Sequence, residues 1–145
     1  MTTARYAAAA ITITPKKIWI TGGWDDIDGG NPLKSTEYQG ESEGNGPDLP
    51  RPLSSHCLAR MDQKSILVTG GTDGPFNALR NSWIFDISSE EWTNGPSMNQ
   101  ARRSHGCTTL PSSLIVVGGG RVLASVEVLN RKEWTTGNLL YVYNP

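Results

Sequence analysis

The fold is decided by the stretch Ile66-Leu67-Val68-Thr69-Gly70-Gly71, because the chain contains two further copies of its pattern. An apolar run followed by two glycines also occupies residues 18–23 and 114–119. The three glycine pairs are 48 residues apart: Gly22-Gly23, Gly70-Gly71 and Gly118-Gly119. The runs are rich in β-branched residues and too short for helices, so each predicts a buried strand. Paired glycines at a strand end allow positive φ and the close approach of a neighbouring sheet.

The rest of each unit repeats as well. A second strand is predicted at 35–39, 82–86 and 125–129, with Tyr38, Phe85 and Val128 in register. A short strand follows, marked by Trp92 and Trp134 in the second and third units and by Glu43 in the first. A further strand starts near His56 and near His105, and residues 6–13 take its place in the first unit. Each unit therefore has four short strands, and a period near 48 residues indicates a repeat architecture.

This pattern resembles the kelch-repeat family. The residues that carry the resemblance are the three glycine pairs, Tyr38, Phe85, Trp92, Trp134 and the run Arg102-Arg103-Ser104-His105. The resemblance implies an all-β fold, a partial β-propeller of three four-stranded antiparallel kelch-type blades. A single array is expected, with blade 1 at about 4–50, blade 2 at about 51–100, blade 3 at about 101–140 and a tail at 141–145. Glu43, Val128 and Ala8 to Ala10 depart from the family pattern.

Composition excludes several classes of protein. The chain has 145 residues and a net charge of -1, which gives no electrostatic footprint for nucleic acid or for an anionic membrane. No apolar run is long enough to span a membrane as a helix. Two cysteines are too few for a disulfide scaffold, and no clear signal peptide is present, which favours a cytoplasmic chain.

The glycine pairs, Trp92 and Trp134 are expected to be structural. Each tryptophan offers apolar area for packing on an adjacent blade and an N–H for a backbone carbonyl. His56 and His105 are expected to be structural histidines, because two histidines without a third ligand predict no metal site.

Cys57 and Cys107 are placed where they could face each other between blades 2 and 3. Cys57 follows His56 directly and Cys107 lies two residues after His105, so the two thiols point to opposite sides of their strands. Two separate buried thiols are the favoured state, and a disulfide is the alternative.

Three blades do not close a propeller ring, which typically has four to eight. Each open blade face measures about 320 Å² and is worth about 8 kcal/mol if it is apolar and buried. We therefore expect the chain to be part of a longer protein. The alternatives are that two copies form a six-bladed ring, or that the end blades are disordered or polar-capped. The apolar stretch at 139–143 is expected to pair with an edge strand.

Candidate binding residues lie in the loops after the glycine pairs and before the innermost strands, where the family resemblance implies that partners bind. They are Trp24, Arg51, Phe76, Arg80, Arg102 and Arg103. Arginines suit acidic peptides through bidentate carboxylate contacts, and exposed aromatic residues suit apolar anchors.

The sequence therefore predicts a non-enzymatic interaction module with a protein or peptide partner. Neither catalytic residues nor a cofactor or metal is expected. The resemblance suggests adaptor roles, such as substrate recognition for a ubiquitin ligase or actin-linked scaffolding. The alternative is a fragment of a carbohydrate-active, galactose-oxidase-like propeller enzyme without its metal ligands.

Overall fold

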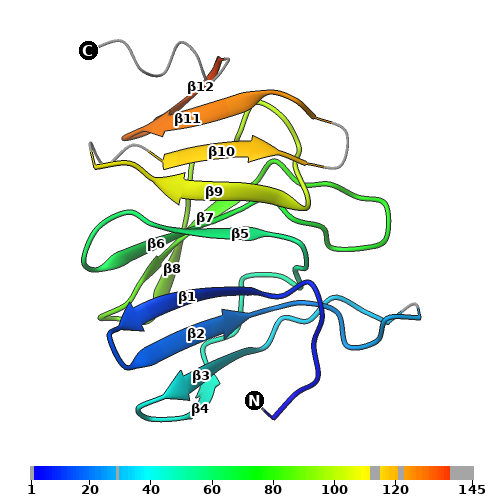
Figure 1. Ribbon diagram of the computed structural model, residues 1–145, viewed down its shortest axis with the longest axis vertical. Coiled ribbons are helices and arrows are strands. Elements are labelled where there is room, and N and C mark those ends of the chain that lie inside the picture. Colours follow the sequence, from blue (N-terminus) through cyan, green and yellow to red (C-terminus); the bar gives the residue numbers. More distant parts are fainter. Residues whose placement is uncertain (1, 29, 112–114, 121–122, 138–145) are drawn as a thin grey trace.

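The computed structural model describes residues 2–28, 30–111, 115–120 and 123–137. These residues form three four-stranded sheets in which neighbouring strands are antiparallel and consecutive in sequence (Figure 1). The predicted partial β-propeller of three kelch-type blades is confirmed. The expected strand at 139–143 and the tail at 141–145 lie outside the described residues, as do Leu114, Arg121 and Val122.

Each blade is one sheet. Blade 1 consists of β1 (Ala9–Thr14), β2 (Lys17–Thr21), β3 (Thr36–Gly40) and β4 (Gly44–Gly46). Blade 2 consists of β5 (Cys57–Arg60), β6 (Ser65–Thr69), β7 (Ser82–Asp86) and β8 (Glu91–Asn94). Blade 3 consists of β9 (His105–Thr109), β10 (Ile115–Gly119), β11 (Val126–Asn130) and β12 (Glu133–Gly137). Within the described residues, the structure has no helix of the length and apolarity needed to cross a membrane.

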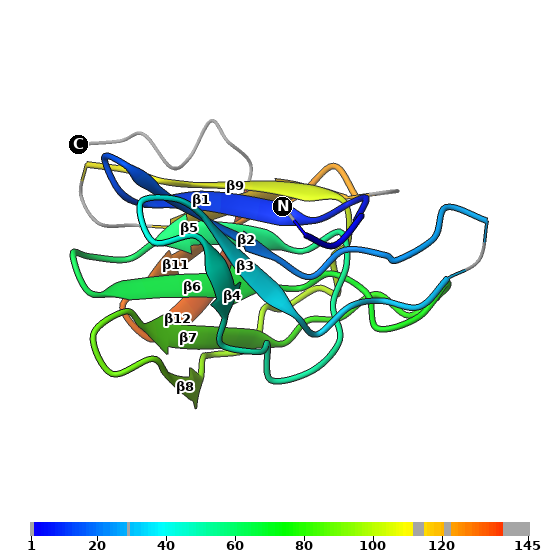
Figure 2. The same ribbon diagram turned by 90° about the horizontal axis from the view of Figure 1, so that it is seen from below.

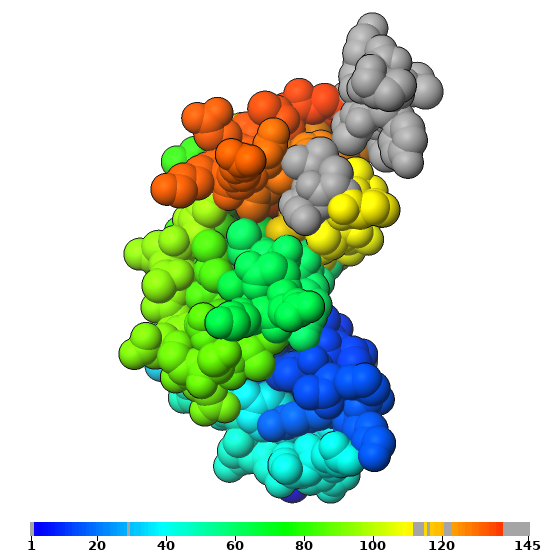
Figure 3. Space-filling view, turned by 90° about the vertical axis from the view of Figure 1, so that its left-hand side faces the viewer, coloured from blue at the N-terminus to red at the C-terminus, as the bar shows by residue number. Residues whose placement is uncertain are grey.

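The blades stack into a crescent. Figures 1 and 2 show the three sheets side by side, with β1, β5 and β9 lying next to one another. In Figure 3 these first strands line the concave side of the crescent, and the later strands of blades 2 and 3 form the convex side. The first strand of each blade is therefore the innermost strand, as it is in a closed ring of blades.

Apolar side chains fill both contacts between blades. Trp19 and Tyr38 of blade 1 pack with Ile66 and Phe85 of blade 2. Leu67 and Ala59 of blade 2 and Met98, in the segment before blade 3, pack with residues of blade 3, namely Ile115, Val117, Leu129 and Trp134. Each buried large side chain contributes about 1.5–3 kcal/mol, so these contacts are the main source of cohesion between blades.

The third glycine pair lies one residue later than the sequence predicts. Gly22, Gly23, Gly70 and Gly71 have φ values of 57°, 95°, 56° and 90°, and in blade 3 the positive values fall at Gly119 (73°) and Gly120 (123°). The prediction of Gly118-Gly119 is wrong because blade 3 has three consecutive glycines and the turn uses the last two. The corrected interval from Gly70 to Gly119 matches that from His56 to His105.

The register of Phe85 is also corrected. Tyr38 pairs with Trp19, three residues before Gly22, and the residue that pairs with Leu67, three before Gly70, is Ile84. Phe85 therefore occupies the alternate position, and its side chain packs on blade 1 instead of continuing the row of Tyr38.

Cys57 and Cys107 form a disulfide, with their Cα atoms 6.0 Å apart. The favoured expectation of two separate thiols is wrong. Cys57 lies on the face of β5 that is turned to blade 3, and Cys107 lies on the face of β9 that is turned to blade 2, so the strand alternation brings the sulfurs together.

Candidate partner-binding site

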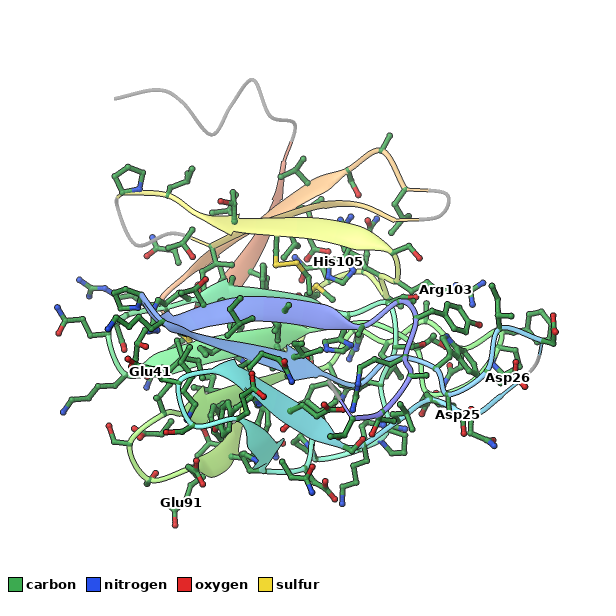
Figure 4. The ribbon with its side chains drawn as sticks, turned by 60° about the horizontal axis from the view of Figure 1, so that its bottom comes forward. Asp25, Asp26, Glu41, Glu91, Arg103 and His105 are labelled. Atoms are coloured by element: carbon green, nitrogen blue, oxygen red, sulfur yellow. A yellow bond between two sulfur atoms is a disulfide. The ribbon has the colours of Figure 1, made fainter. Side chains whose placement is uncertain are left out.

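The loops after the glycine pairs and the segments before the innermost strands lie at the same end of the blades. Short antiparallel bridges join them, Tyr6 to Trp24 in blade 1 and Ser54 to Thr72 in blade 2. In each bridge the two residues exchange backbone hydrogen bonds of 2.8–3.1 Å. Figure 4 shows Asp25 and Arg103 at this end of the strands, with Glu41 at the opposite end.

A pocket of about 680 Å³ opens at this end. Residues of all three blades line it: Tyr6, Trp24, Ile27, Gly30, Asn31, Ser55, Thr72, Pro75, Arg103 and Ser104. Its size suits a few side chains of a peptide or a small ligand. Because each blade supplies only part of the wall, the pocket exists only when the blades are stacked.

The aromatic wall comes from blade 1. The rings of Tyr6 and Trp24 stack with centroids 6.3 Å apart and planes inclined by 17°. Tyr6 is 38% exposed and Trp24 is half-buried. The bridge between their backbones holds both rings in place, so this wall is preorganised for an apolar or planar group.

The polar wall comes mainly from blades 2 and 3. The half-buried Arg103 donates from Nη1 to the carbonyl oxygen of Pro75, over 2.6 Å, which fixes its guanidinium beside the loop of blade 2. Ser55 and Ser104 both have a φ of 53°, and the equivalent Ala7 has a φ of 52°. A positive φ is unusual for a residue with a Cβ.

A row of backbone hydrogen bonds explains this conformation. The N–H of Ser55 donates to the carbonyl of Ala7 over 2.8 Å, and the N–H of Ser104 donates to the carbonyl of Ser55 over 2.9 Å. The same residue in successive blades thus links each blade to the next around the inner edge. The left-handed backbone is retained because the surrounding sheet contacts hold it.

Arg102 cannot bind a partner. Its side chain is 0% exposed, and its Nε donates to Glu127 Oε1 at 3.1 Å. Its Nη1 donates to the carbonyls of Gly119 and Ser125. The prediction of a rim arginine is wrong at this position because the side chain turns inward to a buried carboxylate.

Arg5 repeats this arrangement in blade 1, and sequence reasoning missed it. Its guanidinium donates to Glu37 Oε1 at 2.8 Å and to the carbonyls of Gly22 and Ser35. Burial alone raises the pKa of Glu37, but hydrogen bonds from the N–H groups of Thr2 and Thr3 and the Arg5 guanidinium outweigh it and lower the pKa to about 2. The signal available in the sequence is the equal spacing of Arg5 from Gly22 and of Arg102 from Gly119.

The remaining predicted residues differ in their surroundings. Arg51 forms an ion pair with Asp73, and its side chain is 39% exposed. Phe76 is 88% exposed, and Arg80 is exposed as well. None of these three lines the pocket, whereas Trp24 and Arg103 do.

His56 and His105 join neighbouring blades. His56 Nε2 lies 2.7 Å from Thr21 Oγ1 of blade 1, and His105 Nε2 lies 3.0 Å from Thr69 Oγ1 of blade 2. Burial lowers the pKa of His56 to about 3 and that of His105 to about 4. Both rings are therefore neutral at physiological pH, as structural side chains.

Comparison with known proteins agrees with this arrangement. The Kelch motif matches residues 54–99, which include the four strands of blade 2. Kelch-like protein 25 of Homo sapiens is 35% identical over 79 residues, covering 54% of this chain and 13% of that protein. Beta-scruin of Limulus polyphemus is 35% identical over 89 residues, covering 54% of this chain and 9% of that protein.

A weaker similarity is to tRNA wybutosine-synthesizing protein 4 of Saccharomyces cerevisiae, at 27% identity over 79 residues, 54% of this chain and 11% of that protein. The matched part of the chain thus spans 13% or less of the length of these relatives. Three stacked four-stranded sheets with paired glycines at the turns define a blade-repeat protein. Its second blade matches the Kelch motif, and the chain is similar to kelch-repeat proteins.

Proposed function

We propose that the chain is a non-enzymatic protein-interaction module that presents its loop pocket to a protein or peptide partner, as an adaptor or scaffold does. One observation carries the proposal: the pocket combines an aromatic wall, Tyr6 and Trp24, with a fixed guanidinium, Arg103, from another blade. Aromatic and arginine side chains in one preorganised pocket are the usual centre of a protein interface. The kelch-repeat relatives support this class of function.

The chemistry of the pocket favours an acidic peptide. Its polar lining consists of side-chain amide, hydroxyl and guanidinium groups, from Asn31, Ser55, Thr72, Ser104 and Arg103. The nearby Asp25 and Asp26 carboxylates accept backbone hydrogen bonds within their own loop, from Asn31 and Asp28. The lining is therefore rich in donors, and a guanidinium pairs with a carboxylate by two parallel hydrogen bonds.

The proposal is tested with fluorescent peptides that carry one or two carboxylates beside an aromatic or aliphatic side chain. Arg103→Ala and Trp24→Ala are each expected to weaken binding at least tenfold, because each removes one wall of the pocket. Arg80→Ala is the matched control, since Arg80 is exposed in a nearby loop outside the pocket. Equal binding by the Arg103→Ala variant and the unchanged chain would rule out the site.

We also propose that the open blade faces are covered in the working protein, by further blades of a longer chain or by a second copy. Light scattering separates these proposals, because a mass of twice 15.7 kDa is expected for a pair. A cooperatively melting monomer would show that neither cover is needed.

A further inference from the structure

We propose that the Cys57–Cys107 disulfide is a redox-sensitive lock that sets the geometry of the loop pocket. The proposal rests on the proposed function only where peptide binding is concerned. The bond joins the first residue of β5 to the third residue of β9, which are the innermost strands of blades 2 and 3. Figure 4 shows it as the yellow bond between the sheets.

The disulfide lies between two weaker contacts, one between the residues just before β5 and β9 and one between the two strands themselves. Before it in sequence, the N–H of Ser104 donates to the carbonyl of Ser55 over 2.9 Å. After it, Thr109 Oγ1 donates to the carbonyl of Arg60 over 2.6 Å. Because a single hydrogen bond adds little net stability in water, the covalent bond is the strongest single link in this row.

The equivalent row between blades 1 and 2 has the two hydrogen bonds and no covalent link. There the N–H of Ser55 donates to the carbonyl of Ala7, and Arg60 Nη2 donates to the carbonyl of Ile13. Ala9 and Leu58 occupy the positions that correspond to Cys57 and Cys107. The positions are counted from the residues with positive φ, Ala7 and Ser55 in this row. The lock is thus specific to the contact between blades 2 and 3.

This contact is one side of the pocket. Ser55 lies two residues before Cys57, and Arg103 and Ser104 lie four and three residues before Cys107; all three line the pocket. A bond that fixes the separation of β5 and β9 also fixes where Arg103 stands relative to Ser55. Breaking the bond leaves only the hydrogen bonds to hold that position.

The chemistry needs a thiol reductant from solution. A dithiol delivers two electrons: one of its thiolates attacks a protein sulfur, the S–S bond breaks, and a mixed disulfide forms. The second thiolate resolves it, so the reagent leaves as a cyclic disulfide and Cys57 and Cys107 become thiols. Both cysteines are half-buried and not fully enclosed, so the reagent has partial access.

The test compares the oxidised chain, the chain reduced with a dithiol and the Cys57→Ser/Cys107→Ser variant. Amide hydrogen exchange reports on each strand, and the acidic peptide reports on the pocket. On loss of the bond, exchange of the β5 and β9 amides is expected to rise at least tenfold while β2 and β3 amides change little, and peptide affinity is expected to fall about tenfold. Agreement between the reduced chain and the double variant excludes an effect of the serines.

Unchanged exchange in β5 and β9 after reduction would overturn the lock. Faster exchange with unchanged peptide affinity would overturn its coupling to the pocket. If neither form binds the peptide, the proposed function fails, while the exchange data still decide whether the bond holds the two strands together.

Discussion

The two contacts between blades use the same polar frame and different filling. Both have a threonine–histidine pair, an N–H of a turn glycine donating to the next blade, and an indole N–H donating to a backbone carbonyl. Between blades 1 and 2, an aromatic cluster fills the space. The ring centroids of Trp19 and Phe85 are 4.5 Å apart in a stacked arrangement, and those of Phe85 and Trp92 are 4.9 Å apart. Between blades 2 and 3, mostly aliphatic side chains, together with Trp134 and a disulfide, take this place.

This difference shows that the repeat preserves the hydrogen bonds between blades more strictly than the sizes of the side chains packed between them. The turn glycines explain why. A Cβ on Gly70 would lie 2.4 Å from the carbonyl oxygen of Arg102, and one on Gly22 would lie 2.2 Å from that of Leu53. The backbones of adjacent blades therefore meet at fixed places. Different sets of side chains can then fill the space between the two sheets.

The largest effect is expected from Trp19→Ala, which removes the centre of the aromatic cluster. Trp19 is 0% exposed and contacts both Phe85 and Trp92. Loss of a buried tryptophan costs about 3–5 kcal/mol of unfolding free energy, measured by urea denaturation. Phe76→Ala, at an 88% exposed side chain, is the control and is expected to change stability by less than about 0.5 kcal/mol. A small effect of Trp19→Ala would mean that blade 1 adds little to the fold.

Arg102→Leu is expected to cost about 3–4 kcal/mol, because it leaves Glu127 buried without its cation. Blade 2 supplies a matched control: the positions that hold arginine and glutamate in blades 1 and 3 hold Leu53 and Trp83, which share an apolar cluster. The double variant Arg102→Leu/Glu127→Trp copies that pair and is expected to recover part of the loss. Denaturation curves of the two variants check this. Equal stability of both would show that an apolar pair like that of blade 2 cannot replace the ion pair in blade 3.

Loss of the disulfide is expected to lower the unfolding free energy by about 2–4 kcal/mol, since it closes a loop between cysteines 50 positions apart. Thermal melting of the Cys57→Ser/Cys107→Ser variant measures this. Melting of the unchanged chain in a reducing buffer should give the same shift. If the variant melts at the same temperature as the oxidised chain, the disulfide adds nothing measurable to the stability that the apolar side chains of this contact provide.

Acid is expected to destabilise both contacts through their histidines. The folded-state pKa values of about 3 for His56 and about 4 for His105 lie below the unfolded value near 6.5, so the unfolded chain binds more protons between these limits. Stability is therefore full above about pH 6.5 and falls as the pH drops towards 4, by about 2 kcal/mol from pH 6 to 5 for two histidines. His56→Ala, which copies the alanine of blade 1, is expected to halve this slope. A flat profile in the unchanged chain would contradict the buried neutral state.

Trp92→Phe is expected to have the smallest effect, about 1 kcal/mol, because it keeps the aromatic packing and removes one hydrogen bond. That bond runs from the indole N–H to the carbonyl of Asp48, over 2.9 Å. Trp134→Phe removes the equivalent bond to Pro96 in the other contact. Similar losses by urea denaturation would show that the polar frame is equivalent in both contacts, and unequal losses would show that the filling alters it.

Much of the fold could be predicted from local pattern. The apolar runs, the paired glycines and the tryptophans recur at near-equal spacing, and such short-range signals define strands and turns. Less of the site could be predicted. Trp24 and Arg103 were placed in the correct loops, but Tyr6, Ser55 and Ser104 were missed because their side chains carry no binding signal in sequence.

The local pattern of residues is enough to predict a kelch-type array of four-stranded blades, because each blade is built from contacts between residues close in the chain. Which of the two adjacent arginines faces the pocket depends on contacts between distant parts of the chain. Arg102 is buried because its partner, Glu127, lies on a different strand of blade 3, while Arg103 faces the pocket. The pairing of Cys57 with Cys107 likewise depends on how the blades stack. Strand alternation gives the side to which a residue points, but the group it meets there belongs to a distant part of the chain, whose position is fixed only when the blades stack.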